Sequence, residues 1–330
     1  MNFGDTSNAY PLRWGFVGTG NIATLMATVV STTPAARLCA VASRHIDSAQ
    51  SFAAEHGAER AFDSWAEMLA WDDLDAVYVA TPTCLREEIS IAAAAAGKHV
   101  LAEKPFASLS SLERITAACR DHGVSFMDAT HFVHHPRYAV IKQNTAEMLG
   151  PPRSLDSRFL ISLTNREDIR YDPALEPLGA MGDLGWYNMR ATLEYLAPEV
   201  SVDTATTNLQ RDAATGAIIA GHGSLTFDDD SVSHWQCSFD AASVDIGLTL
   251  TGSRGALRMD NFIGEDESHA ASYRYAGESD VSVASRQSGA ALMFEDFAAA
   301  VRDTSLREHW MQASECTQAL LDAALAAANS

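Results

Sequence analysis

Between residues 13 and 128 the chain alternates short apolar runs with longer segments whose apolar residues recur at helical spacing. This alternation is typical of repeated β-α-β units, so it predicts a doubly wound parallel sheet covered by helices. Gly57, Gly97 and Gly123 stand where helix ends are expected. The predicted strands are residues 14–17, 37–42, 76–80, 99–102 and 125–128, and the predicted helices are residues 21–31, 47–55, 64–70, 86–96 and 108–122.

The alternation stops after about residue 136. From residue 204 to residue 259, strand-like segments follow one another with turn signals between them, which indicates a mostly antiparallel sheet. We also expect a strand at 154–162, a charged loop at 164–177, and helices at 136–149, from about 185, at 292–303 and at 308–329. The predicted α/β chain therefore has a parallel-sheet domain at residues 1–130 and an α+β domain at residues 131–330.

Charge narrows the range of partners. The 330 residues are 47% hydrophobic, enough for two ordinary globular cores. Lys and Arg number 23 against 43 Asp and Glu, which gives a formal net charge of −20. This surface repels phosphates and anionic lipid, so we expect neither a nucleic-acid nor a membrane partner. An anionic ligand would need a local reversal of this charge.

Cysteine usage and the first residues bear on the compartment. The five cysteines are scattered and include no C-x-x-C, so neither a disulfide framework nor a zinc site is encoded. Residues 1–11 lack the basic and apolar regions of a secretory signal, and the chain has no 18-residue apolar stretch. We therefore expect a cytoplasmic protein.

A glycine-rich turn provides the local reversal of charge. Gly18, Gly20 and Ala23 form G-x-G-x-x-A after the first predicted strand, and Asn21 and Ile22 begin the following helix. Gly18 would make the tight turn, Gly20 would let the backbone approach a pyrophosphate, and Ala23 would allow close packing of helix on strand. The helix start offers N–H donors and positive potential to that anion. The alternative is a turn with a purely steric role, but the β-α-β context favours dinucleotide binding.

The end of the second predicted strand favours NADP(H) over NAD(H). An acidic residue there would accept hydrogen bonds from the ribose hydroxyls, but this chain has Ser43 and Arg44, and no carboxylate before Asp47. Arg44 suits a 2′-phosphate, and Ser43 adds a hydroxyl donor. The alternative is that Arg44 is only a solvated loop charge.

Two further runs follow predicted strands, at the edge where ligands of such sheets bind. One contains Thr81 and Pro82, and the other ends in Glu103, Lys104 and Pro105. A lysine directly after an apolar strand would be partly desolvated beside the nicotinamide, where it could bind a substrate oxygen or lower the pKa of a hydroxyl. Taken alone, Lys104 is better interpreted as part of a structural salt bridge.

Three motifs together resemble the Gfo/Idh/MocA oxidoreductase family. They are the glycine turn, the run A-G-K-H-V-L-A-E-K-P at residues 96–105, and the run G-A-M-G-D-L-G-W-Y at residues 179–187. The resemblance implies a Rossmann domain and a C-terminal α/β domain whose open sheet often forms a dimer interface. It also implies redox chemistry on sugars, cyclitols or diols with NAD(P). The dihydrodiol and sugar dehydrogenase branch is the part of the family that this chain resembles most.

The resemblance assigns roles by position. Lys104 corresponds to the catalytic lysine of the E-K-P motif, Asp183 to the acid of D-x-G-x-H/Y, and Tyr187 to the final position of that motif. Tyr187, its pKa lowered by Lys104, would then be the acid or base that moves the proton while hydride moves to or from the nicotinamide. Without the family, Asp183 would be interpreted as a helix N-cap and Tyr187 as a core aromatic.

Some positions depart from the family pattern. Thr83 and Arg86 stand where relatives usually have asparagine and histidine. His131, His134 and His135 lie close together in the sequence, but no carboxylate has a suitable spacing, so we predict no metal site. We expect His134 or His135 to touch the substrate. Arg170 matches a basic position near the substrate in relatives, with a loop salt bridge as the alternative.

These observations predict an NADP-dependent oxidoreductase that interconverts hydroxyl and carbonyl on a neutral sugar, polyol or cyclic diol, working as a homodimer or larger homo-oligomer. Two alternatives stay open. One is a nucleotide-binding sensor without catalysis, and the other is an NAD-dependent glycoside hydrolase of the same fold. A sensor would have no need of a proton donor such as Tyr187.

Overall fold

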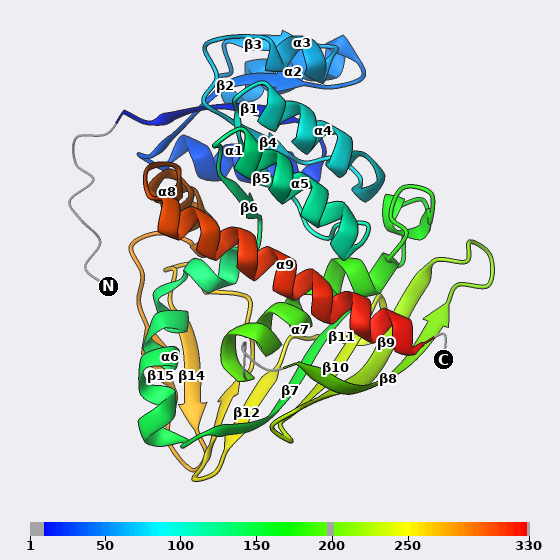
Figure 1. The fold of residues 1–330 in the computed structure, drawn as a ribbon, viewed down its shortest axis with the longest axis vertical. Helices are drawn as coiled ribbons and strands as arrows, with labels where there is room; N and C mark the ends of the chain where they lie inside the picture. Colours follow the sequence, from blue (N-terminus) through cyan, green and yellow to red (C-terminus); the bar gives the residue numbers. More distant parts are fainter. Residues whose placement is uncertain (1–9, 197–200, 329–330) are drawn as a thin grey trace.

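Two β-sheets organise the chain, and the long helix α9 runs between them (Figure 1). The computed structural model describes residues 10–196 and 201–328. The first sheet is parallel, with six strands in the order β3-β2-β1-β4-β5-β6. These strands are β1 (Leu12–Val17), β2 (Ala36–Ala42), β3 (Arg60–Phe62), β4 (Ala76–Val79), β5 (His99–Ala102) and β6 (Phe126–Asp128).

Five helices connect the strands of the first sheet. They are α1 (Asn21–Ser31), α2 (Ile46–His56), α3 (Trp65–Leu69), α4 (Thr83–Ala95) and α5 (Leu109–Asp121). All five helices and five of the strands begin and end within three residues of the predicted bounds, so the predicted doubly wound sheet is confirmed. The edge strand β3 was not predicted, because three partly exposed residues are too short to show a periodic pattern.

The second sheet has nine strands. Eight follow the order β15-β14-β13-β12-β7-β10-β9-β8, and β11 pairs with β7. Within this sheet, only β7 and β10 are parallel neighbours among the described strands, so the prediction of a mostly antiparallel sheet is confirmed. The strands are β7 (Pro152–Ser162), β8 (Val202–Arg211), β9 (Ile218–Phe227), β10 (Val232–Ser238), β11 (Asp240–Asp245), β12 (Leu248–Gly252), β13 (Ala256–Met259), β14 (Ala271–Tyr275) and β15 (Val281–Val283).

Strands β14 and β15 are absent from the sequence predictions. Both are short, and they lie at the edge of the sheet after a polar stretch, where hydrophobic alternation is weak. The helix predicted from about residue 185 begins earlier, as a wide π-type turn, η3 (Met181–Gly185), that runs directly into α7 (Trp186–Ala191) and η4 (Thr192–Leu196). The remaining short helices are η1 (His131–His134), α6 (Pro136–Met148) and η2 (Ile169–Tyr171).

The last two helices join the sheets. They are α8 (Gly289–Arg302) and α9 (Thr304–Ala327), and the predicted end of the second at residue 329 lies outside the described residues. Trp14 of β1 packs on Phe294 and Phe297 of α8, with ring centroids 5.0 Å apart in both pairs. The sequence predicts both helices as part of the second domain, and α8 also packs on the first sheet, so one continuous core joins the two sheets. No helix in the described ranges combines the length and apolar character needed to cross a membrane.

Candidate active site

The glycine turn at the start of α1 has an open side. Gly18 has a φ of +113°, and a Cβ there would lie 2.5 Å from the carbonyl oxygen of Ala80, so only glycine fits. At Gly20 nothing lies within 4 Å of an added Cβ. No side chain caps α1, and its first turn contains no acidic residue, so its N–H donors face open space. These features fit the pyrophosphate of a dinucleotide.

The end of β2 lies beside this turn. The Thr19 hydroxyl is 3.4 Å from the Ser43 hydroxyl, which places Ser43 against the glycine turn. Arg44 is exposed, and within the described part of the chain it has no hydrogen bond or ion pair. Its guanidinium is therefore free to receive a phosphate.

The ends of β4 and β5 form the next part of the site. Thr81 follows β4, and its buried hydroxyl has no hydrogen-bond partner in the structure. Pro82 is then the N-cap residue of α4. Glu103 follows β5 and accepts a hydrogen bond of 2.5 Å from the Tyr78 hydroxyl, and burial raises the pKa of the Glu103 carboxyl. An unpartnered hydroxyl at this strand end suits a polar group of a bound cofactor.

Lys104 meets Asp183 across the two halves of the molecule. Its ammonium donates to the carboxylate oxygen Oδ1 of Asp183 at 2.6 Å and to the Asp183 carbonyl at 2.8 Å. Arg170 donates through Nε to the other oxygen, Oδ2, at 2.6 Å, and is also held by Asp168 at 3.2 Å. Burial alone would raise the pKa of Asp183, but Lys104 and Arg170 lower it to about 2. Asp183 is therefore a carboxylate at neutral pH.

Tyr187 completes this cluster. It lies in α7, four residues after Asp183, and the Lys104 ammonium lies 5.0 Å from the centroid of its ring. The predicted lowering of the pKa of Tyr187 is wrong. Burial raises that pKa well above its ordinary value, and the negative charges of Glu103, Asp183 and Asp128 raise it further. Tyr187 therefore keeps its proton at neutral pH.

The three neighbouring histidines point to different partners. The His131 ring is 6.0 Å from the Tyr187 ring, and burial, with His134 and Lys104, lowers its pKa to about 4. His134 instead pairs through Nδ1 with Asp296 of α8 at 2.6 Å, and His135 hydrogen-bonds the His269 carbonyl at 3.0 Å. No group of three or more metal-ligating side chains occurs among residues 10–196 and 201–328.

The sequence singled out His134 or His135, and not His131, as a substrate contact. His131 is the histidine that contacts the tyrosine, whereas the contacts of His134 hold it against α8 and α9. A substrate contact of His134 stays a prediction. His131 directly follows Thr130 and is the first residue of a short helical turn. That position in the sequence does not show which histidine ring faces the site.

Two charged residues at the site's edge went unrecognised. Arg86 had been noted only as a departure from the family pattern, and Glu176 had not been singled out. Arg86 is buried and donates to the Thr81 carbonyl at 2.9 Å and to the Pro105 carbonyl at 2.5 Å. Glu176 lies 3.5 Å from the guanidinium of Arg86. No local spacing in the sequence connects these two residues.

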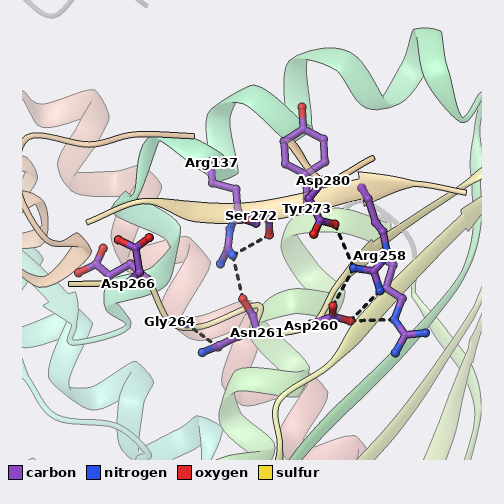
Figure 2. Close-up of a pocket in the computed structure, with 11 residues that line it drawn as sticks. Arg137, Arg258, Asp260, Asn261, Gly264, Asp266, Ser272, Tyr273 and Asp280 are labelled. Carbon is purple, nitrogen blue, oxygen red and sulfur yellow. Dashed lines mark hydrogen bonds and ion pairs between the residues drawn. The ribbon is translucent and has the colours of Figure 1, made fainter. Parts of the chain in front are cut away.

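A separate hollow of about 280 Å³ lies beside β13 and β14 (Figure 2). Arg137 donates there to the carbonyls of Asn261 and Ser272, at 2.8 and 3.2 Å, and Arg274 pairs with Asp260 and Asp280. The charged groups of this hollow therefore largely satisfy one another. Its lining includes none of the residues around Lys104.

Comparison with known proteins agrees with this geometry. Residues 12–130 match the oxidoreductase family with an NAD-binding Rossmann fold, and residues 141–258 match the GFO/IDH/MocA C-terminal domain. A reductase from Streptomyces antibioticus, dTDP-3,4-didehydro-2,6-dideoxy-α-D-glucose 3-reductase, is 33% identical over 262 residues, covering 78% of each chain. The chain belongs to the Gfo/Idh/MocA oxidoreductase family. It is an NAD(P)-dependent oxidoreductase.

Two further relatives extend the comparison. The D-xylose 1-dehydrogenase (NADP(+)) 2 of Haloferax volcanii is 32% identical over 272 residues, which cover 80% of this chain and 81% of the relative. KijD10, a 3-ketoreductase from Actinomadura kijaniata solved with NADP and TDP-benzene, superimposes with a TM-score of 0.87 at 27% identity, covering 96% of this chain and 98% of KijD10. Solved variants of KijD10 replace a lysine by alanine or glutamate, and a tyrosine by phenylalanine.

Proposed function

We propose that this protein is an NADP(H)-dependent oxidoreductase that interconverts a hydroxyl and a carbonyl on a sugar or related polyol. The observation that carries the proposal is the cluster of Lys104, Asp183 and Tyr187, which joins a lysine, a carboxylate and a protonated tyrosine beside the strand ends. These groups match the proton transfer that must accompany hydride transfer at a carbonyl.

The residues divide the work as follows. A bound nicotinamide supplies or accepts the hydride. Tyr187 keeps its proton at neutral pH, so in the direction of reduction its hydroxyl gives a proton to the carbonyl oxygen. Two of the three N–H donors of Lys104 are held by Asp183, which leaves one for an oxygen of the substrate or cofactor. Asp183 and Arg170 hold Lys104 in place.

The coenzyme preference rests on Arg44. It stands at the end of β2 with no carboxylate paired to it in the described ranges, and Ser43 adds a hydroxyl. A guanidinium binds a 2′-phosphate more favourably than it binds a ribose hydroxyl. The NADP-dependent xylose dehydrogenase and KijD10 with bound NADP support the same choice.

Relatives support a sugar as the substrate, but in two forms. Several act on nucleotide-linked keto sugars, which carry a diphosphate, and one acts on the free sugar xylose. The net charge of −20 favours the neutral form, because an acidic surface repels a diphosphate. A free sugar or polyol is therefore the proposed substrate, with a nucleotide-linked sugar as the alternative for the test to decide.

A turnover panel tests this proposal. Purified protein is mixed with NADPH or NADP⁺ and with free aldoses, ketoses, polyols, a trans-dihydrodiol and a dTDP-linked keto sugar, and the absorbance of the reduced nicotinamide is followed. We expect turnover of a neutral sugar, and we expect Lys104→Met and Tyr187→Phe each to lower kcat by roughly 10²- to 10⁴-fold. Turnover of the dTDP-linked sugar alone would select the alternative substrate.

Lys142 provides a matched control. Its ammonium lies 5.2 Å from the Tyr138 ring centroid, the same kind of pair as Lys104 and Tyr187, and its side chain is 53% exposed. Lys142→Met should leave kcat within about twofold of wild type. Wild-type rates in both site variants would refute the assigned roles. Nucleotide binding without turnover on the whole panel would favour a sensor, and cleavage of a glycoside without net use of NADPH would favour a hydrolase.

A further inference from the structure

Arg86 and Glu176 form a buried ion pair next to the candidate active site. Their side chains are 8% and 11% exposed, and Nη2 of Arg86 lies 3.5 Å from Oε1 of Glu176. Thr83 closes the ring: its hydroxyl donates to Oε2 of Glu176 at 2.5 Å and accepts from Nη1 of Arg86 at 2.7 Å. Such a pair is costly to break, because either charge left alone would be buried without a partner.

The Glu176 end of this ring anchors a distant loop. The backbone N–H of Thr83 donates to Oε1 of Glu176 at 3.0 Å, and the N–H of Cys84 donates to the Leu175 carbonyl at 3.3 Å. The N-cap residue of α4 is Pro82, whose side chain cannot accept a hydrogen bond from the first N–H groups of the helix. Residues 175 and 176, about 90 residues later in the chain, accept these hydrogen bonds instead. This loop also carries Arg170, which holds Asp183.

The Arg86 end fixes the segment that carries Lys104. Arg86 donates to the carbonyls of Thr81 and Pro105, so it ties the ends of β4 and β5 together. The Pro105 ring in turn packs on Gly182, where an added Cβ would lie 2.6 Å from Cγ of the proline. Gly182 directly precedes Asp183. The Arg86–Glu176 pair is therefore connected, through Pro105 and Gly182, to both sides of the Lys104–Asp183 contact.

We propose that Arg86 and Glu176 are positioning residues that hold Lys104 of the first sheet in register with Asp183 and Arg170 of the second domain. They form a latch between the ends of β4 and β5 and the loop at residues 164–178. They act through Lys104 and Asp183, since neither belongs to the Lys104–Asp183–Tyr187 cluster. This inference rests on the proposed function, because the latch aligns the groups assigned to catalysis there.

Kinetics of two latch variants test the inference. In Glu176→Gln and in Arg86→Met we expect kcat to fall at least tenfold, while the Kd of NADPH stays within twofold, because the glycine turn and Arg44 lie on other elements. The double variant should be no worse than the poorer single variant, since both changes open the same latch. Unchanged kcat in both variants, or an equal loss of kcat and nucleotide affinity, would overturn the inference.

Glu87 is the matched control on the same helix. It pairs with Arg114 at 2.6 Å on an exposed face of α4, one residue beyond Arg86. Glu87→Gln should leave kcat and the Kd of NADPH unchanged. A similar fall of kcat in Glu87→Gln would show that any lost ion pair on α4 has this effect, and would overturn a specific latch.

Hydrogen exchange separates failure of the latch from failure of the proposed function. If wild type turns over none of the sugars, the proposed function fails, and the latch is then judged on exchange alone. We expect amides at residues 164–178 and 181–187 to exchange at least fivefold faster in Glu176→Gln than in wild type, but not in Glu87→Gln. Unchanged exchange in those segments would overturn the latch, whatever the activity.

Discussion

Two loop arginines show how much a single residue depends on its partners. Arg170 is held by Asp168 and Asp183, so its charge is used within the protein. Arg44 is exposed, and no carboxylate in residues 10–196 or 201–328 pairs with it. A guanidinium without a partner loses no existing contact when it binds a phosphate, which makes Arg44 the better anion ligand of the two.

Replacing Arg44 should separate the two coenzymes. In Arg44→Ala we expect the Kd of NADPH to rise at least tenfold, with the Kd of NADH within twofold, because only NADPH carries the 2′-phosphate. Fluorescence titration of the reduced coenzymes at one ionic strength measures both constants. Arg60→Ala, which removes an exposed arginine stacked on Trp71, is the control and should change neither. An unchanged Kd for NADPH in Arg44→Ala would contradict the assignment.

His99 makes stability depend on pH. Its Nδ1 accepts the Ser125 N–H at 2.9 Å, which requires a neutral ring, and burial together with Arg307 lowers its pKa to about 4. The unfolded chain takes up this proton near pH 6.5, so the stability is present above about pH 6.5 and is lost as pH falls toward 4. His131, with a pKa of about 4, adds in the same direction.

Urea unfolding between pH 7 and pH 4.5 measures this effect. We expect the free energy of unfolding to fall on the order of 1–2 kcal/mol per histidine over that range. His99→Gln should flatten the slope, whereas His122→Gln, at an exposed position after α5, should leave it unchanged. A slope identical in wild type and His99→Gln would contradict the role of His99. Asp183 has a pKa of about 2, so the stability that its carboxylate contributes is lost only below about pH 4.

At the scale of the element, the start of α1 assigns different tasks to two glycines that look equivalent in the sequence. Gly18 needs its positive φ and its close approach to Ala80 for the turn to form at all. Gly20 has an ordinary extended conformation, with φ −80° and ψ −178°, and open space where a side chain would stand. We therefore expect the first glycine to serve the fold and the second to serve the ligand.

Two alanine substitutions should separate these tasks. Gly20→Ala should leave the melting temperature unchanged and raise the Kd of NADPH at least tenfold, because the new methyl group fills the approach to the helix N-terminus. Gly18→Ala should lower the free energy of unfolding by about 1–3 kcal/mol through backbone strain. Differential scanning fluorimetry and coenzyme titration measure both. Normal binding by a destabilised Gly20→Ala protein would contradict this division.

At the scale of the whole molecule, the first strand of the parallel sheet packs on a helix from the last part of the chain. Trp14, near the start of the described residues, packs on Phe294 and Phe297 near the end, and all three are buried. The two sheets therefore share one core, and we expect them to unfold together.

Truncating Phe294 tests this shared core. Phe294→Ala should lower the free energy of unfolding by about 3–5 kcal/mol in one cooperative transition, because it leaves a cavity between β1 and α8. Leu25→Ala, at a position 55% exposed on α1, is the control and should cost less than about 1 kcal/mol. Urea unfolding followed by tryptophan fluorescence and by circular dichroism should give coincident curves. Two separate transitions, with only one shifted, would contradict a shared core.

The second sheet leaves a polar surface. Helices α7 and α9 pack on one face, and the other presents exposed polar side chains such as Thr206, His222 and Gln236. The homodimer expected from the family stays a prediction that light scattering can check. The predicted boundary near residue 130 and the cytoplasmic location are likewise untested.

The sequence alone determined the features that local spacing encodes. The helices, most strands and the G-x-G-x-x-A turn could be read from it, because periodicity and short motifs depend on neighbouring residues. The resemblance to the family, and not spacing, singled out Lys104, Asp183 and Tyr187. The tertiary structure decided what depends on distant partners. It joined Arg86 to Glu176, placed His131 beside Tyr187, and raised the pKa of that tyrosine. Burial and charge pairing arise only when segments far apart in the chain pack together.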